Sequence, residues 1–478
     1  MKKLFFSFFI PAILLSAVAS SGQVAIDKIS LVSYENTNAN FCFNNTKLMA
    51  GNSINDRYIV YYNSDTVFLN VFQSGSWTKK TVYAGNKIVS ATMTFYKDTI
   101  WICWKEGIYI KAGYTNDKGK TWSKVMNVSP AGNVASPSVY ASNNGKIHFT
   151  WSRDTIIYHN VYNNGTFLPE SRSLSNLGAQ GQMPSVIAIG DTVLATWREG
   201  PLPTKVWFRS SFDRGQSWNK LSSAPTTDIL ALSKDPNIAY SYDSATSTHY
   251  VYLAFDGQNK IYLQRSTDLG NSWSAPEIVS NTGKLSQFAH IESNNKGFVG
   301  ISYEQRPIGS SLYDDTKKDV GFTYSTNWGK KGTFSMDTLA YTNNGFGSAY
   351  PAFNKIDENN FYLAWLTKDT ISNKINVLER LVSLSNTTGI DADEQDMRQS
   401  IGIFPNPFSM QTILQVNKNF GNSTLTVYNS YGQAVKQIEN LSGSTITFYR
   451  DNLPVGVYFA RLTQNGNIIM VDKLLIID

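Results

Sequence analysis

Short apolar runs that read as β-strands recur at intervals of about 40 to 50 residues, and this repeat limits the fold more than any other feature of the chain. The runs are 58–62, 100–104, 147–151, 193–197, 251–255, 298–303 and 361–365. Each is rich in the β-branched and aromatic residues that strands favour. Repeats of this length indicate units that bury their apolar faces against one another. We therefore expect about seven such units.

Several units open on a strand that contains proline. These segments are 136–139, 183–186, 235–238 and 350–353. Proline is tolerated at the first residue of a strand, where its missing N–H is not needed, and it holds the preceding residue extended. Three further short strands joined by polar turns follow in each unit. Four antiparallel strands repeated radially form a propeller blade, so the sequence predicts an all-β fold: a β-propeller of about seven four-stranded blades over 26–384, with six blades as the alternative.

The last unit lacks an obvious fourth strand of its own. The segment 28–33, near the N-terminus, alternates apolar and polar residues in the way a strand does. We expect this segment to supply the missing strand, so that the two ends of the propeller sequence meet in one sheet and close the ring.

Three tight turns between the third and fourth strands share the pattern Ser/Thr-x-Asp-x-Gly-x-Ser/Thr-Trp. They span 115–122, 211–218 and 266–273. We expect Asp to accept turn N–H groups, Gly to adopt a positive φ and Trp to pack back onto the blade. The residues in these roles are Asp117, Gly119, Trp122, Asp213, Gly215, Trp218, Asp268, Gly270 and Trp273.

These three turns resemble the Asp-box of bacterial neuraminidase repeats, and 325–329 is similar to a degenerate fourth copy. In sialidase-like propellers such turns lie away from the active face and serve folding. The resemblance therefore implies a sialidase-like propeller in which the three aspartates are structural.

The second strand of most units ends in an aromatic residue followed by a charged one. In a propeller these strand ends open on one face around the central channel, together with the residues that precede the strand-opening prolines, so function is expected there. The polar and charged residues placed at this rim are Arg153, Arg198, Glu199, Asp235, Asp256, Glu304, Arg306 and Tyr350. We expect Trp104, Trp151 and Trp197 to pack between blades rather than stack on sugars.

Arginines and carboxylates that converge on one mouth would suit an acidic sugar, because Arg clamps a carboxylate with a bidentate fork and carboxylates supply acid and base. Sialidases use a Tyr nucleophile, and Ala349-Tyr350 resembles the place where that family carries it. The resemblance implies Tyr350 as nucleophile, Glu304 as its base and Asp235 as acid. It also implies a substrate clamp made by Arg153, Arg198 and Arg306, with Glu199 and Asp256 beside it. The family's N-terminal Arg-Ile-Pro-type motif is absent from the region before and within the first unit, which favours binding over catalysis.

Three functions stay open on this evidence: a glycan-binding module, an exo-acting glycoside hydrolase of the sialidase type, and a protein-interaction platform. The structural alternative for every rim charge is a solvated group or a salt bridge between blades. A formal net charge of +6 over 478 residues, with no basic block interleaved with aromatics, argues against nucleic-acid binding. No Cys/His spacing indicates zinc, and no cofactor is expected.

The N-terminus has the features of a secretory signal peptide over 1–19. Lys2 and Lys3 precede the apolar run 4–15, and small residues stand at Ala17 and Ala19. A membrane-spanning helix needs about 20 apolar residues, more than this run or any later one offers, so no transmembrane segment is expected. Cys42 and Cys103 would pass through an oxidising route, and both a disulfide and two buried thiols remain open.

The chain changes character after residue 384. The stretch 385–399 is polar and acidic and is interpreted as a linker. From 400 to 478, short alternating strands joined by Gly and Asn turns indicate a small β-sandwich. The order of its motifs resembles the type A C-terminal sorting domain of the type IX secretion system; these motifs lie at 403–408, 425–433, 453–459 and 473–475. The resemblance implies recognition by the secretion machinery, and release or attachment at the cell surface.

Overall fold

A computed structural model of the chain describes residues 23–27, 29–35, 40–41, 47–201, 204–219, 222–223, 234–311, 314–335, 338–341, 347–368, 375–385, 400–429, 433–464 and 467–478. The chain divides between Asn386 and Thr387 into two compact units. The expected signal peptide and Cys42 lie outside the described residues, as does the expected linker beyond Ser385, whereas Cys103 is described and buried.

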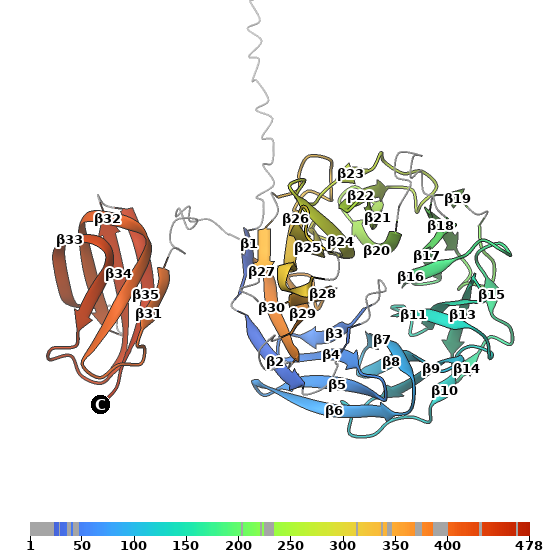
Figure 1. Ribbon diagram of the computed structural model, residues 1–478, viewed down its shortest axis with the longest axis horizontal. Helices are drawn as coiled ribbons and strands as arrows, with labels where there is room; N and C mark the ends of the chain where they lie inside the picture. Colours follow the sequence, from blue (N-terminus) through green and yellow to red (C-terminus); the bar gives the residue numbers. More distant parts are fainter. Residues whose placement is uncertain are drawn as a thin grey trace, which may run out of the picture. The chain divides into compact units, whose positions relative to one another are not determined.

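The described residues of the first unit form seven antiparallel sheets arranged in a ring, and we call the centre of this ring the channel (Figure 1). The first sheet holds β3 (Met49–Ser53), β4 (Asp56–Tyr62), β5 (Thr66–Gln73) and β6 (Ser76–Ala84). The second holds β7 (Ile88–Tyr96), β8 (Thr99–Glu106), β9 (Tyr109–Thr115) and β10 (Met126–Asn127). The third holds β11 (Val134–Ala141), β12 (Ile147–Arg153) and β13 (Ile156–Asn163), with β14 (Thr166–Phe167) and β15 (Arg172–Ser173) both on β13.

The next three sheets repeat the same order. The fourth holds β16 (Gln182–Ile189), β17 (Thr192–Glu199), β18 (Lys205–Ser211) and β19 (Ser222–Ser223). The fifth holds β20 (Lys234–Asp243), β21 (Thr248–Gly257), β22 (Lys260–Ser266) and β23 (Glu277–Ile278). The sixth holds β24 (Lys284–Ser293), β25 (Val299–Pro307), β26 (Asp319–Ser325) and β27 (Thr338–Tyr341).

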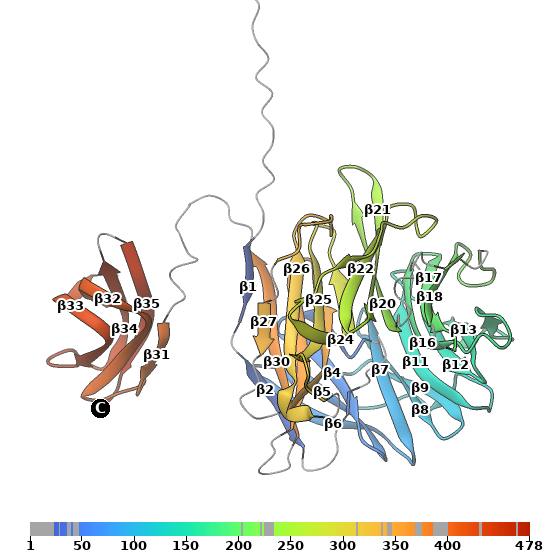
Figure 2. The ribbon, with the colours of Figure 1, turned by 45° about the horizontal axis from the view of Figure 1, so that its top comes forward.

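The seventh sheet closes the ring with strands from both ends of the unit. It holds β28 (Gly347–Lys355), β29 (Asn360–Lys368) and β30 (Ile375–Ser385). Two N-terminal strands, β1 (Gln23–Ile26) and β2 (Ser30–Glu35), pair antiparallel with β30 (Figures 1 and 2). The fourth strand of the last blade therefore comes from the N-terminus, as predicted, and the fold is a propeller of seven blades rather than six.

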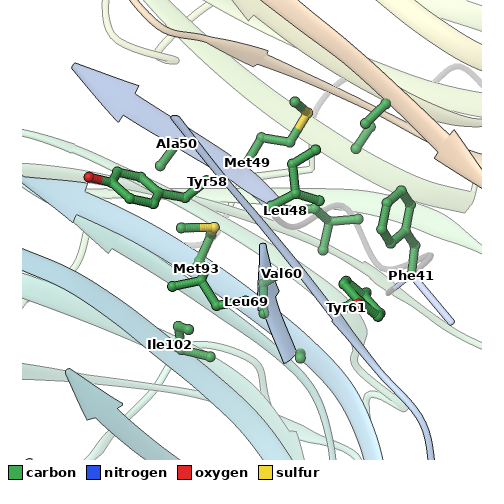
Figure 3. Close-up of a cluster of buried hydrophobic side chains, with 14 of the residues drawn as sticks. Phe41, Leu48, Met49, Ala50, Tyr58, Val60, Tyr61, Leu69, Met93 and Ile102 are labelled. Carbon is green, nitrogen blue, oxygen red and sulfur yellow. The ribbon is translucent and has the colours of Figure 1, made fainter. Parts of the chain in front are cut away.

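Apolar side chains from adjacent sheets fill the space between blades. Figure 3 shows one such cluster, in which Met93 and Ile102 of the second sheet pack with Leu69 of the first. The expectation that the tryptophans pack between blades is confirmed, because Trp104, Trp151 and Trp197 are 0% exposed and each shares a buried cluster with apolar residues of the preceding blade.

The prolines at the start of the blades lie inside their strands, which corrects the prediction that each is a first residue. Pro137 lies within β11 and Pro351 within β28, and in both strands the register shifts at that point. The preceding residues, Ser136 and Tyr350, have φ of 54° and 55° and are not extended. The first strand of each blade is an edge strand, and a bulge on an edge needs no N–H at that residue, so proline is accommodated there.

The three Asp turns have the predicted internal hydrogen bonds. In the turn of the fourth blade, Asp213 accepts hydrogen bonds from Ser217 N at 2.8 Å and from Ser211 Oγ at 2.8 Å. Gly215 has a φ of 82°, and a Cβ added to it would lie 2.1 Å from the ring of His159 in the third blade. Trp218 also packs on His159, with ring centroids 5.1 Å apart. The turn therefore packs against the preceding blade as well as its own.

We expect Asp213→Ala to lower the free energy of unfolding by about 1–3 kcal/mol, because turn groups that bond the carboxylate lose their acceptor. Asp213→Asn, which keeps one acceptor oxygen, is the matched control and should lose less. Chemical denaturation of the three proteins measures the effect. Unchanged stability together with lost ligand binding would reverse the structural assignment.

The seam where the ring closes holds a buried ion pair. Arg57 on β4 donates from Nη2 and Nε to the two carboxylate oxygens of Glu379 on β30, at 2.5 and 3.1 Å. The guanidinium carbon lies 3.5 Å from the ring centroid of Phe72 and 4.5 Å from that of Tyr362. Trp77 Nε1 donates to the same carboxylate at 3.3 Å. This cluster joins the first blade to the seventh.

Removing one member of this pair should destabilise the propeller strongly. We expect Glu379→Ala to cost about 3–5 kcal/mol, because it leaves the buried Arg57 guanidinium without its counter-charge. The double variant Arg57→Met/Glu379→Met removes both charges and should recover much of that loss. Denaturant midpoints of the two variants and the parent measure this, and a single variant within about 1 kcal/mol of the parent would contradict it.

The second unit is a small all-β domain with its own core. Its strands are β31 (Ser400–Phe404), β32 (Gln411–Asn429), β33 (Ala434–Tyr449), β34 (Gly456–Gln464) and β35 (Asn467–Ile476), in the order β31-β32-β34-β35 with β33 also on β32. Leu414, Phe448 and Leu462 are buried at its centre. Across the described parts of both units, there is no helix long and apolar enough to span a membrane.

Candidate functional site

The direction of the strands gives the channel two distinct ends. First strands begin and second strands end at one of them, which we call the mouth end. First strands end at the other, where third strands also run into the Asp turns, and we call it the turn end. The rim residues expected from the sequence belong to the mouth end.

A ring of bulges surrounds the channel near the mouth end. In six of the described first strands the register with the second strand shifts, and a residue other than glycine adopts a left-handed φ there. These bulge residues, with φ between 46° and 62°, are Ser90, Ser136, Met183, Asp235, Phe288 and Tyr350. Bulges re-aim side chains, and left-handed backbone outside glycine is costly and concentrates at functional sites.

Bulge residues of neighbouring blades contact each other. Ser136 Oγ lies 3.5 Å from Met183 Sδ, which joins the third blade to the fourth. The rings of Phe288 and Tyr350 have centroids 5.9 Å apart, which joins the sixth blade to the seventh. The mouth end therefore presents aromatic and polar side chains from several blades close to one another.

Arg198 and Asp235 are two predicted site residues that the fold brings together. Arg198, on β17, donates from Nη2 to Gln182 Oε1 at 2.6 Å. Its Nη1 lies 3.9 Å from Asp235 Oδ1 at the bulge of the fifth blade. The Arg198 side chain is 19% exposed and that of Asp235 6%. A guanidinium has five N–H donors, so these two contacts leave Arg198 able to bind a ligand.

The other two arginines of the expected clamp have different neighbours. Arg153 lies 3.8 Å from Asp154 and stacks over Tyr158 at 4.5 Å, both in its own blade. Arg306 is 5% exposed, and its Nε and Nη1 make no hydrogen bond with the described residues. Among the described residues the three arginines share no carboxylate partner, since Arg153 lies near Asp154 and Arg198 near Asp235.

Glu304 lies on β25 of the sixth blade, and Tyr350 lies on β28 of the seventh. Glu304 is fully buried, accepts a hydrogen bond from Gln287 at 2.8 Å and has Lys318 Nζ at 3.6 Å. Gln287 is followed directly by Phe288, whose ring packs on Tyr350. An amide and an ammonium group thus hold the carboxylate expected to act as a base.

Glu199 and Asp256 are buried rather than displayed on the open rim, at 8% and 7% exposed. Glu199 accepts a hydrogen bond from Trp197 Nε1 at 2.7 Å. Burial raises the pKa of Glu199, although the bond from Trp197 and the charge of Arg209 oppose this. In this blade the aromatic-then-charged pattern reflects an indole paired with a carboxylate.

Sequence reasoning missed Gln182, Met183 and Phe288 at the mouth end. A signal existed for Met183, which precedes a proline in the same way as Asp235 and Tyr350. Phe288 forms the same bulge before Ala289, so no proline marks it. The described residues contain no group of three or more His, Cys, Asp or Glu side chains arranged to hold a metal ion.

The second unit matches a known family. Residues 402–477 match the model of the secretion system C-terminal sorting domain. These residues are a type IX secretion sorting domain. A protein that carries this sorting domain at its C-terminus is secreted or held at the cell surface, as the sequence motifs implied.

The propeller resembles several solved structures. A polysaccharide lyase of family PL25, an ulvan lyase, is 12% identical, with a TM-score of 0.49 over 73% of this chain and 94% of the other. A mutant Trypanosoma rangeli sialidase with trans-sialidase activity is 10% identical, with a TM-score of 0.41 over 87% and 88%. A six-bladed fucose-binding lectin of Aleuria aurantia is 11% identical, with a TM-score of 0.42 over 64% and 100%. These similarities are too distant to transfer an activity. A search of curated proteins with the sequence gave no match.

Proposed function

We propose that this protein is exported by the type IX secretion system and that its propeller binds an acidic glycan at the mouth end of the channel. In this proposal 1–19 is the signal peptide that starts export, and the sorting domain completes it. The three Asp turns are Asp-boxes of the neuraminidase repeat type, which stabilise the blades at the opposite end.

The placement of Arg198 carries the proposal. Its guanidinium is partly exposed, oriented by Gln182 and 3.9 Å from the Asp235 carboxylate. An arginine fixed by neighbours loses little freedom when it binds, and its planar fork suits a sugar carboxylate. The aromatic pair Phe288 and Tyr350 belongs to the same ring of bulges and offers flat apolar surface to a sugar ring.

Binding is favoured over hydrolysis because the groups required for turnover are engaged elsewhere. Arg153 stacks on Tyr158 of its own blade. Glu304 is buried with Lys318 Nζ at 3.6 Å, and this ammonium competes with any other partner of the carboxylate. A hydrolase of the sialidase type remains the alternative, and so does a protein-interaction platform.

We expect Arg198→Ala to weaken binding of an acidic glycan by about 10- to 100-fold, which corresponds to the loss of a hydrogen bond to a charged group. Calorimetric titration with sialylated and uronate-containing oligosaccharides, chosen from a glycan array, measures this. Arg172→Ala is the matched control, since Arg172 is exposed on the outer strand β15. Equal affinity of the parent and Arg198→Ala would refute the proposal.

The same reagents separate the alternatives. Turnover of a fluorogenic sialoside that Tyr350→Phe abolishes would establish the hydrolase instead. A binding module is expected to give two results: the Tyr350→Phe variant retains its affinity for the acidic glycan, and the parent protein does not turn over the sialoside. Absence of binding to every acidic glycan leaves the interaction platform.

A further inference from the structure

A pocket lies at the turn end of the channel, opposite the mouth. It has a volume of about 200 Å³ and is lined by the ends of first strands from five blades. Ala50, Phe95, Ala141, Glu292 and Lys355 represent those five strands. Because the Asp turns stand at this same end, neither the proposed glycan site nor any rim residue belongs to the pocket.

The floor of the pocket is polar and tightly held. Lys47 forms an ion pair with Glu292. Asn354 Nδ2 donates to Glu292 Oε1 at 3.1 Å, and Asn354 Oδ1 accepts from Met49 N at 3.1 Å. The carbonyl oxygen of Lys47 accepts from Thr92 Oγ1 at 3.0 Å. Contacts among four blades therefore fix one ammonium, one carboxylate and one amide at the base of the pocket.

Aromatic rings form part of the wall. Tyr140 and Phe95 both line the pocket, and Lys47 Nζ lies 5.5 Å from the centroid of the Tyr140 ring. At the rim, Lys355 pairs with Glu358 at 3.0 Å. Both lysines that line the pocket in the described part of the chain are therefore charge-balanced, and no cation among these described residues is left uncompensated to attract an anion.

The chemistry of the lining selects the ligand class. An ammonium has three donors and a carboxylate about four acceptor sites, so the Lys47–Glu292 pair can still bond groups that both donate and accept, as hydroxyls do. Flat aromatic walls suit a ring with apolar faces. A volume of about 200 Å³ is several times the space that one water needs, so the pocket can hold a small organic ring.

We propose that the turn-end pocket binds a single neutral sugar ring. The charged floor disfavours an apolar ligand, the balanced charges disfavour an anion, and one carboxylate is too few for a metal ion. The inference concerns a site separate from the mouth, so it stands or falls independently of the acidic glycan.

Saturation-transfer NMR of the full chain with neutral methyl glycopyranosides tests the pocket, followed by titration with those that bind. Ala141→Leu should fill the pocket without touching its charges and reduce affinity at least 10-fold. Ala245→Leu, the same substitution on the exposed β20–β21 turn at the same end, should leave the affinity unchanged. Melting temperatures of both variants confirm that they are folded.

Two results would overturn the pocket proposal. One is absence of binding by every neutral glycoside of the panel, and the other is binding that Ala141→Leu leaves intact. Acidic glycans are titrated in parallel. If the Arg198→Ala variant no longer binds the acidic glycan but still binds the neutral sugar, the two sites are independent, and each proposal can fail without the other.

Discussion

A chain that lacks residues 402–478 is expected to accumulate in the periplasm instead of reaching the medium or the cell surface. The sorting domain lies in a compact unit with its own buried core. Its removal should therefore abolish export while the propeller still folds. Immunodetection in periplasmic, surface and medium fractions measures the distribution of the truncated chain.

A full-length chain whose sorting domain cannot fold is the matched control, because it too should fail to be exported. Leu462→Asp places a charge in the core of the sorting domain, where Leu462 is 0% exposed, and should block export without shortening the chain. The propeller melting temperature should be the same in all three proteins. Normal appearance of the truncated protein in the medium would contradict the role assigned to the sorting domain.

The fold followed from the sequence because its signals are local. Strand runs such as 100–104 and 193–197 are rich in the residues that strands favour, and the hydrogen bonds of the Asp turns form within each turn. The closing strand could also be predicted, because a propeller with one strand missing has only the N-terminal segment left to supply it.

The site was less predictable because it depends on the direction of side chains. Trp197, Arg198 and Glu199 are consecutive, and alternation along a strand sends Arg198 to the opposite side from the other two. Arg198 reaches the fifth blade, whereas Glu199 bonds Trp197. The aromatic-then-charged pattern placed Arg198 and Glu199 at the same rim because both are close to the end of the strand. It carries no information about the side of the sheet to which each side chain points.

The bulges in the first strands could not be predicted from the sequence for a different reason. A residue before proline usually avoids the helical region and is extended. Ser136 and Tyr350 instead adopt a left-handed φ, which the general preference gives no reason to expect. The register shift that requires it involves the second strand as well, so it is a property of the paired strands and not of the dipeptide.

The propeller is expected to lose stability steeply as the pH falls from 7 to 5, because three buried histidines must stay neutral. Burial lowers the pKa of His148 to about 3, with Lys146 adding to the shift and Asp191 opposing it. Burial and the neighbouring His148 hold the pKa of His159 well below its usual value. Burial and Lys47 lower the pKa of His290 to about 3.

The sign follows from proton uptake on unfolding. A histidine with a pKa of about 6.5 in the unfolded chain binds a proton below that pH, whereas these three stay neutral in the folded chain well below it. Unfolding therefore takes up protons, and stability falls as the pH falls. Each histidine then costs about 1.4 kcal/mol for each pH unit, or about 2 kcal/mol at pH 5. The three histidines together should lower the free energy of unfolding by about 6 kcal/mol at pH 5, which is comparable with the whole stability of many domains.

Urea denaturation of the full chain between pH 7.5 and pH 5 tests this expectation. His148 Nδ1 and His159 Nε2 lie 3.1 Å apart, so replacing both as His148→Asn/His159→Gln removes a coupled pair and should reduce the slope to about 1.4 kcal/mol for each pH unit, the share left to His290. His249→Asn is the matched control, because His249 is exposed and its variant should keep the full slope. Stability of the parent that stays flat over this range, or a slope that the double substitution leaves unchanged, would show that protons do not unfold the propeller through these side chains.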